Sequence, residues 1–446
     1  MARKKVKDYK PVTVPFSATP AGEPPSVMEW ANRDVWTDRM LTTLQNGVQG
    51  GKWHTLIDKV FAPQNLFYAS RKVTSKRTTA AGVDHQTATD FQTHSSQELQ
   101  RLHDALRTDT YVPQAIRRVW IPKPGSSDQR PLGIPTIRDR VVQTALLNVL
   151  EPIFDVTFSE ASYGFRHGRG CHHALERVEQ LLEAGYVHVV DADLKSYFDT
   201  IPKDRLLALI GEKVSDSRIL RMVQMFLDQG VMEGLCEWTP EAGTPQGAVI
   251  SPLLANIYLN PLDHLLSEAG FALVRYADDF VILCQTREEA ERALEQVQGW
   301  VASSGLTLHP TKTKLVDARE ESFAFLGYSF RGELRFPREK SLEKLKDGIR
   351  VKTKRKQGDN LSTICGRLRS QLQGWFNYFH HCHWSVFKEL DSWIRGRLRS
   401  ILRKRSKRRG RGRGKDHQRW PNAFFDKHGL YSLGAAHRSL VQSSMR

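Results

Sequence analysis

The sequence predicts an α/β protein that ends in a mostly helical part, and three observations lead to this prediction. The first is an apolar run at 271–284 (FALVRYADDFVILC), whose two halves suit short buried strands joined by a bend. The second is 205–227, where apolar residues recur at helical spacing. The third is 331–400, which has the pattern of several amphipathic helices. With 446 residues, the chain is long enough for two or three domains.

Composition divides the chain into five segments. We expect a Lys- and Pro-rich flexible tail at 1–27, a helical segment at 28–110, and strands and helices at 111–330. Amphipathic helices are expected at 331–402, and a basic segment at 403–446, of which 403–415 has a flexible composition. Within the third segment, we expect a helix that begins at Ser251 and a strand over 323–330.

Positive charge is concentrated near the C-terminus. The whole chain has a net charge of +17, yet residues 331–446 hold 30 Lys and Arg against 9 Asp and Glu. This asymmetry indicates a polyanionic partner, either nucleic acid or an anionic membrane. The chain has no apolar stretch near the ~20 residues that a spanning helix needs, and no signal peptide opens it. We therefore expect a nucleic-acid-binding protein of the bacterial cytosol or nucleoid, with no membrane partner.

Two pairs of acidic residues interrupt apolar strands. Asp278 and Asp279 lie at the bend within 271–284, where adjacent carboxylates are costly unless a cation neutralises them. Asp191 and Asp193 follow a second apolar stretch and alternate onto one strand face. Two Mg²⁺ ions about 4 Å apart can activate a 3′-hydroxyl and stabilise a leaving oxygen. The sequence therefore predicts a two-metal site; a solvated Asp-Asp turn is the alternative, which the apolar flanks disfavour.

These acidic residues belong to short blocks that follow the order of a known family. With YADD at 276–279 and DLKSYF at 193–198, the chain resembles the group II intron-encoded reverse transcriptase/maturases. The other matching blocks are AGVD at 81–84, IPKPG at 121–125, RPLGIP at 130–135, DRVVQ at 139–143, SYGFR at 162–166, GTPQG at 243–247, SPL at 251–253, LHPTKTKL at 308–315 and FLGY at 325–328.

The resemblance implies a right-hand polymerase with an antiparallel sheet and a helical thumb. Residues 28–110 would extend the fingers, 111–330 would form fingers and palm, 331–402 would form the thumb or maturase (X) domain, and 403–446 would bind DNA or RNA. The implied activity is RNA-directed DNA synthesis from dNTPs with two Mg²⁺ ions, for which Mn²⁺ could substitute. The implied partners are the intron RNA, whose splicing and retrohoming the maturase promotes, and a DNA target with its primer.

The resemblance also gives roles to single residues. In the family, an aromatic residue lies five positions after the metal ligand, and this spacing matches Asp193 and Phe198. Asp193 is therefore the implied metal ligand, together with Asp278, Asp279 and the backbone of Leu194. Asp191 is then structural. Phe198 resembles the residue beneath the incoming sugar that excludes ribonucleotides, although its spacing alone favours a core role. The other residues expected near the nucleotide are Lys123, Arg130, Gln246 and Lys312.

The C-terminal part resembles the thumb of the same family. GWFNYF at 374–379, WIRGRLR at 393–399 and GLYSL at 429–433 carry this resemblance. Basic side chains here are expected to contact phosphate, namely Arg395, Arg397, Arg399, Arg403, Lys404, Arg405, Lys407, Arg408, Arg409, Arg411, Arg413 and Lys415. HHCH at 380–383 suggests zinc, but we expect none, because adjacent ligands on a helix cannot all face one metal.

Two alternatives to an intron-encoded enzyme remain open. Many relatives carry a C-terminal endonuclease with paired cysteines, whereas this chain ends at Arg446 without one, so we expect the endonuclease-lacking type. The first alternative is a free-standing, domesticated relative used in DNA repair or phage defence, which the DNA flanking the gene would distinguish. The second is an RNA-binding maturase whose polymerase has decayed, against which Asp193, Asp278 and Asp279 argue.

Overall fold

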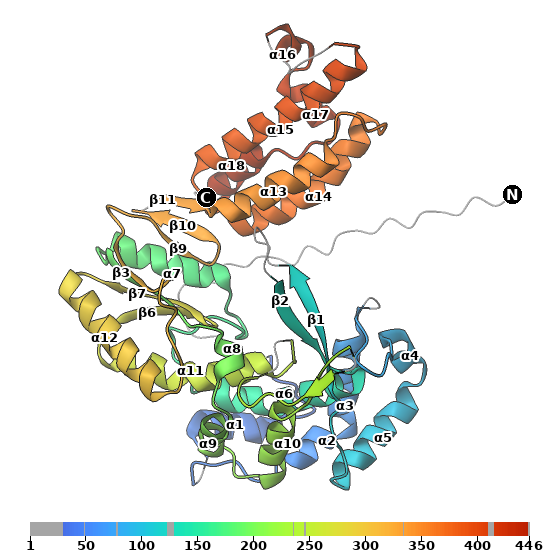
Figure 1. The fold of residues 1–446 in the computed structure, drawn as a ribbon, viewed down its shortest axis with the longest axis vertical. Helices are drawn as coiled ribbons and strands as arrows, with labels where there is room; N and C mark the ends of the chain where they lie inside the picture. The colour runs from blue at the N-terminus through green and yellow to red at the C-terminus, as the bar shows by residue number, and fades with distance from the viewer. Residues whose placement is uncertain are drawn as a thin grey trace, which may run out of the picture.

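The computed structural model describes residues 30–48, 50–76, 79–122, 129–234, 236–244, 247–332, 334–408 and 414–444. Figure 1 shows an open C, with C-terminal helices at the top, a central sheet at the left and an N-terminal lobe at the bottom. The expected features that lie outside the described residues are the tail at 1–27 and the side chains of Lys123, Gln246, Arg409, Arg411 and Arg413.

The N-terminal lobe begins with helices, as expected for 28–110. They are α1 (Asp38–Asn46), α2 (Ile57–Phe61), α3 (Pro63–Thr74), α4 (Ala88–Thr93) and α5 (Ser95–Arg107). The apolar helix α6 (Ile137–Asp155) is buried along most of its length and packs against α2, α3 and α5. This packing makes α6 the core of the lobe.

A mixed four-stranded sheet in the order β2-β1-β4-β5 completes this lobe. Its strands are β1 (Ile116–Pro122), β2 (Gln129–Ile134), β4 (Val231–Glu233) and β5 (Cys236–Trp238). The helical segment expected at 205–227 is divided into α9 (Lys203–Gly211) and α10 (Ser217–Leu227). The break lies at Asp216, which caps α10 and also accepts hydrogen bonds from the amides of Leu56 and Ile57 at 2.7 and 3.0 Å.

The central antiparallel sheet has the strand order β6-β7-β3-β8. Its strands are β3 (His188–Asp193), β6 (Ala272–Tyr276), β7 (Asp279–Cys284) and β8 (Lys314–Asp317). Side chains alternate between faces along each strand, so Val190 and Phe280 face a core shared with α11 (Ser251–Glu268) and α12 (Arg287–Ser303). Val189 and Val281 instead face a second core, shared with α7 (Cys171–Glu183) and the C-terminal helices.

A small three-stranded sheet leads into the C-terminal helices. It consists of β9 (Phe323–Phe325), β10 (Tyr328–Arg331) and β11 (Leu334–Pro337), in the order β11-β10-β9. The strand expected at 323–330 is therefore two strands, separated by Leu326 and Gly327 at φ values of 47° and 80°. The helices expected from residue 331 begin only at Glu339, because residues 328–337 pair as a hairpin.

The C-terminal helices are α13 (Glu339–Lys352), α14 (Leu361–Phe379), α15 (Trp384–Arg405), α16 (Lys415–Arg419), α17 (Asn422–Lys427) and α18 (Leu433–Ser444). The buried Asp391 on α15 accepts hydrogen bonds from Ser432 Oγ at 2.7 Å and from the Leu433 amide at 3.0 Å. This contact fixes the 429–433 block at the start of α18. None of the helices in the described residues is long and apolar enough to cross a membrane.

Candidate active site

Strand register brings the three expected metal-binding carboxylates together. Asp193 is the last residue of β3 and is paired with Asp279, the first residue of β7. Directly paired residues of antiparallel strands place their side chains on the same face of the sheet. Asp278 lies in the turn that joins β6 to β7, since Tyr276 is paired with Asp279. One end of the sheet therefore carries all three carboxylates.

The carboxylates are costly to ionise together. Burial raises the pKa of Asp279 to about 7, and repulsion from Asp191, Asp278 and Asp193 adds to the increase, while a hydrogen bond from the Leu326 backbone opposes it. Burial also raises the pKa of Asp278, with a further contribution from Asp193. A cation placed among these side chains would remove this repulsion.

Asp191 belongs to the same electrostatic cluster. It lies on the face of β3 that carries Asp193, two residues away. Burial raises the pKa of Asp191 to about 6; Arg338 opposes this increase and Asp193 adds to it. In the strand register, Asp191 lies opposite Lys314 of β8. A structural role for Asp191 stays a prediction, but its charge contributes to the raised pKa of Asp279.

Lys312 supplies positive charge to this cluster. Its Nζ lies 2.5 Å from Oδ2 of Asp193. The preceding segment is fixed to the end of β3, because the His309 amide donates to the Asp193 carbonyl at 2.7 Å and Leu194 forms a β-bridge with Leu308. The structure thus brings Lys312 and the Leu194 backbone next to Asp193, as their block positions led us to expect.

A buried arginine that the sequence analysis did not single out supports the YADD turn. Arg275 is 1% exposed and donates to both carboxylate oxygens of Asp263, with 2.7 Å between Nε and Oδ1. The same guanidinium donates to the Ala277 carbonyl at 2.9 Å, to Asn256 Oδ1 at 2.9 Å and to Ser162 Oγ at 2.8 Å. The sequence signal was a single basic residue inside an apolar run.

The SYGFR block lies against the same turn. A Cβ atom on Gly164 would lie 2.4 Å from the Ala277 amide nitrogen, so only glycine fits there without a shift of the backbone. The Tyr163 amide donates to the Arg275 carbonyl at 2.8 Å, and Asn256 donates to the Gly164 carbonyl at 2.8 Å. Ala277 has a φ of 60°, which this packing holds in place.

Comparisons with known proteins identify the fold and the family. Residues 121–330 match the family described as reverse transcriptase (RNA-dependent DNA polymerase), and residues 342–420 match the group II intron, maturase-specific domain. The protein YkfC of Escherichia coli (strain K12) is 35% identical over 314 residues, which cover 61% of this chain and 82% of YkfC. The chain belongs to the group II intron-encoded reverse transcriptase/maturase family.

Two other proteins match over a smaller share of their length. The group II intron-encoded protein LtrA of Lactococcus lactis subsp. cremoris is 37% identical over 202 residues, or 45% of this chain and 32% of LtrA. A solved structure described as a partial Cas6-RT-Cas1–Cas2 complex is 27% identical, with a TM-score of 0.36, over 56% of this chain and 42% of that one. The expected fold class, an α/β right-hand polymerase with a helical C-terminal part, is confirmed, and the protein is an RNA-directed DNA polymerase.

The carboxylate cluster of this reverse transcriptase/maturase fits a hard divalent cation. Reverse transcriptases as a family depend on divalent metal ions. Carboxylate oxygens are the ligands that Mg²⁺ prefers, and Asp193, Asp278 and Asp279 offer them at one end of the sheet. Burial, together with repulsion between the carboxylates, raises the pKa of Asp278 and Asp279, and a bound cation would favour their ionised forms.

Phe198 and Arg130, two of the expected nucleotide-binding residues, lie on separate elements. Phe198 is half-buried on the short helix α8 (Tyr197–Thr200), which follows β3. The Thr244 amide donates to the Phe198 carbonyl at 2.6 Å, so the GTPQG loop is held against α8. Arg130 is exposed on β2, and a Cβ on Gly247 would lie 2.3 Å from the Gly133 carbonyl of the same strand. The described ends of this block, Thr244 and Gly247, therefore lie against α8 and β2, respectively.

The basic residues of α15 differ in how far they reach the surface. Arg399 is 4% exposed and donates to the Trp420 carbonyl at 3.0 Å and to Asn422 Oδ1 at 2.9 Å. This burial contradicts the phosphate contact that we expected for Arg399. Arg397 donates to Thr353 Oγ1 at 2.7 Å, and its pKa is lowered by burial and by Arg350.

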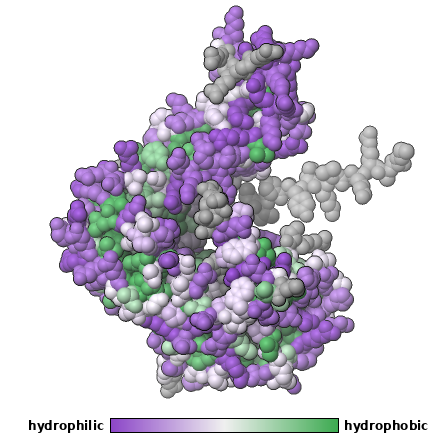
Figure 2. Space-filling view, viewed as in Figure 1, coloured by the Kyte–Doolittle hydropathy of each residue, from purple (hydrophilic) through white to green (hydrophobic). Residues whose placement is uncertain are grey.

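Other basic side chains here are partly committed to ion pairs. Arg395 pairs with Asp391 at 3.7 Å, Arg403 pairs with the buried Asp416, and Arg408 lies 3.9 Å from the same carboxylate. Arg405 donates to the Asp359 carbonyl. The exposed lysines of the segment are Lys404, Lys407 and Lys415. Figure 2 shows that the visible face of the C-terminal helices is mostly hydrophilic.

Proposed function

We propose that Asp193, Asp278 and Asp279 hold two Mg²⁺ ions, for which Mn²⁺ can substitute, and that the enzyme extends a DNA primer along an RNA template. The observation that supports this proposal is the register of Asp193 opposite Asp279, with Asp278 in the adjoining turn. Bound ions would promote ionisation of the primer 3′-hydroxyl and stabilise the leaving pyrophosphate oxygen. The Leu194 backbone completes the proposed ligand set.

The protein's own side chains then position the reactants. Lys312 balances the charge of Asp193 and can contact a triphosphate bound at this site. Phe198 lies under the sugar and excludes a 2′-hydroxyl, since α8 directly follows the strand that carries Asp193. Arg130 on the exposed edge of β2 binds the triphosphate. Lys123 and Gln246, which lie outside the described residues, keep the roles that the resemblance implies.

The maturase-specific part suggests the second half of the function. We assign 28–110 to the extension of the fingers, 111–330 to fingers and palm, 331–402 to the thumb, and 403–446 to nucleic-acid binding, as the sequence led us to expect. The excess of positive charge beyond residue 330 supports binding of the enzyme's own group II intron RNA. This binding stabilises the RNA fold for splicing, and reverse transcription then serves retrohoming into a DNA target.

Two assays on the same proteins test this function. Asp278→Asn and Asp279→Asn should abolish primer extension on an RNA template while intron RNA binding stays near wild type, because the metal-binding carboxylates lie apart from the basic helices. Glu291→Gln, on the exposed surface of α12, is the matched control. Near-wild-type extension by either Asp variant would reject the metal assignment. Intact extension without any stimulation of splicing of the flanking intron would reject the maturase role and favour the free-standing alternative.

A further inference from the structure

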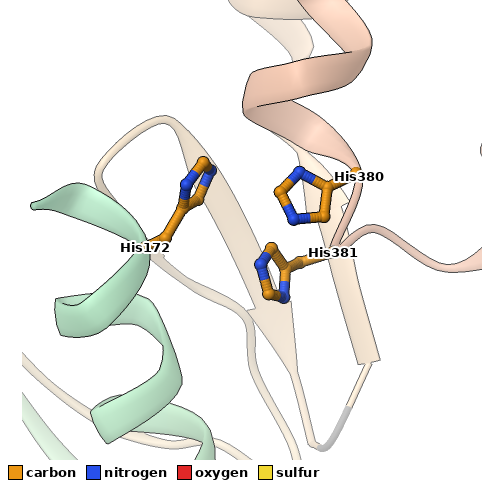
Figure 3. A group of neighbouring side chains, drawn as sticks. All are labelled: His172, His380 and His381. Atoms are coloured by element: carbon orange, nitrogen blue, oxygen red, sulfur yellow. The ribbon is translucent and has the colours of Figure 1, made fainter. Parts of the chain in front are cut away.

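Three histidines outside the carboxylate cluster face one another where α7 meets the end of α14. They are His172 near the start of α7, and His380 and His381 just after α14 (Figure 3). One ring nitrogen from each lies within 4.8 Å of the others, and each residue is half-buried. Ring centroids are 4.9 Å apart for His172 and His380, and 4.1 Å apart for His380 and His381.

The end of α14 explains why two consecutive histidines can turn toward one point. The helix ends at Phe379, His380 is its C-cap, and His381 lies in the turn beyond. Helical geometry therefore does not separate the two rings, and our reason for expecting no zinc at 380–383 does not hold for this pair. The third ring comes from a helix more than 200 residues earlier, which sequence spacing could not reveal.

Hydrogen bonds to backbone carbonyls orient two of the rings. Nε2 of His172 lies 2.9 Å from the Tyr378 carbonyl, and Nδ1 of His380 lies 2.9 Å from the Asn377 carbonyl. A nitrogen that donates to a carbonyl leaves the other nitrogen of the neutral ring with a lone pair, and metal-binding histidines are usually oriented by such a bond. His172 and His380 therefore have the second partner that a ligand histidine needs.

The charges around the rings also suit a metal. Glu176 lies one helical turn after His172, and its charge acts on His380.

Arg335 is the one cation in contact with the rings among the described residues. It lies 3.4 Å from Nδ1 of His381, a long contact, and its other nitrogen is ion-paired with Glu179. The carboxylate of Glu179 offsets the positive charge of Arg335, which would otherwise repel a metal ion. The same ion pair can hold Arg335 in place when the His381 ring rotates to bind the metal.

We propose that His172, His380 and His381 bind one Zn²⁺ ion, with Glu176 completing the site either directly or through a bound water. Imidazole nitrogens favour Zn²⁺ over Mg²⁺, which prefers the carboxylate cluster. Zn–N bonds of about 2.0–2.1 Å in a tetrahedral site place the nitrogens about 3.3 Å apart, so small ring rotations complete the geometry.

The ion would link α7 to the end of α14. Helix α7 packs on the central sheet. These elements already meet there, since Tyr378 accepts from His172 and donates through its hydroxyl to the Leu326 carbonyl at 2.8 Å. The Leu326 backbone in turn bonds Asp279. A Zn²⁺ ion would therefore stabilise the orientation of the C-terminal helices relative to the catalytic carboxylates.

Metal binding by the full chain tests the proposal directly. The purified protein, stripped with a chelator, is titrated with Zn²⁺ in excess Mg²⁺ while bound zinc and the thermal midpoint are measured. We expect one Zn²⁺ per chain and a higher midpoint. His380→Ala and His381→Gln should each lower Zn²⁺ affinity at least tenfold. Co²⁺ in place of Zn²⁺ should give the visible absorption of a tetrahedral site, which these variants should lose.

Matched variants separate this site from other zinc sites. His173→Ala changes the next residue on α7, which is exposed and lies outside the cluster, and should retain Zn²⁺. Asp279→Asn should also retain Zn²⁺, which excludes binding at the catalytic carboxylates. Midpoints measured without metal show whether each variant folds. If the wild type binds no Zn²⁺, or if the cluster variants bind it as tightly as His173→Ala, the proposal is wrong.

Discussion

Arg275 donates hydrogen bonds to both carboxylate oxygens of Asp263, and neither side chain is more than 1% exposed. The pair supports the YADD turn, because the same guanidinium holds the Ala277 carbonyl in the turn that carries Asp278. A buried charge is costly without its partner, so the position of this turn is linked to the stability of the central sheet.

Arg275→Met should therefore destabilise the protein strongly. It leaves the Asp263 carboxylate buried without its partner, which typically costs about 3–5 kcal/mol. Urea unfolding measures the free energy. Arg287→Ala removes an exposed helical ion pair with Glu291 and should cost only about 0.3–0.5 kcal/mol. Equal losses for the two variants would contradict a structural role for the buried pair.

Stability without metal should depend on pH through Asp279. Its folded pKa of about 7 exceeds the unfolded value of about 3.9, so folding takes up a proton between these values. The free energy of unfolding from this group therefore falls as pH rises from about 4 to about 7, and stays low above that range. In EDTA, Asp279→Asn should melt at a higher temperature than wild type at pH 8, with a smaller difference at pH 5.

A second variant checks the sign of this effect. The Arg319 guanidinium lowers the pKa of Asp317 to about 2, so that ion pair stabilises the fold above pH 4. Asp317→Asn should therefore melt at a lower temperature than wild type at pH 8. Adding Mg²⁺ at pH 8 should raise the midpoint of wild type more than that of Asp279→Asn. An unchanged pH profile in Asp279→Asn would show that this carboxyl does not titrate as proposed.

Phe198→Ala should admit ribonucleotides, because it removes the ring that we place under the incoming sugar. The ratio of rNTP to dNTP incorporation in primer extension measures this preference. Phe198→Tyr keeps a ring at the same position and should stay selective for dNTPs. If selectivity is the same in all three proteins, Phe198 is only a core residue packed against Tyr197, whose ring centroid is 5.5 Å away.

Apolar patterning predicted the elements that carry the proposed metal-binding carboxylates. The strand before Asp193, the hairpin around Asp278 and the helix from Ser251 all lie where local pattern placed them. The break between α9 and α10 was missed because Asp216 is fixed by amides about 160 residues earlier. Arg399 was misassigned because the sequence shows its charge but not the helices that cover it.

Long-range contacts also account for the parts of the site that the sequence did not show. Arg275 donates hydrogen bonds to residues from several segments, including Ser162, Asn256 and Asp263. None of these positions carries a local sequence signal for an ion pair. The histidine cluster likewise joins His172 to residues beyond α14. Short blocks in family order identified the polymerase, whereas the contacts between blocks needed the fold.

The exposed lysines should carry much of the salt-dependent binding near the C-terminus. Replacing Lys404, Lys407 and Lys415 with Gln should weaken RNA binding and reduce the slope of log K against log salt by about 0.7–0.9 for each lost phosphate contact. Their exposure makes loss of folding a minor concern. By contrast, Arg399→Gln should lower the thermal midpoint, because its bonds are internal. No change in slope for the triple variant would show that these lysines do not contact phosphate.

Gly164→Ala should impair catalysis more than folding. The added methyl would lie 2.4 Å from the Ala277 amide, so the turn beside Asp278 must move. Displacement of a catalytic group by about 1 Å can reduce rate by about 100-fold. Primer extension should therefore fall sharply while RNA binding by the distant basic helices is retained.

Gly299→Ala on α12 is the control, because nothing lies within 4 Å of its added Cβ and a helical Gly-to-Ala change stabilises by about 0.5–1 kcal/mol. Normal extension by Gly164→Ala would mean that the turn adapts, and that the contact between SYGFR and YADD does not set the position of the carboxylates.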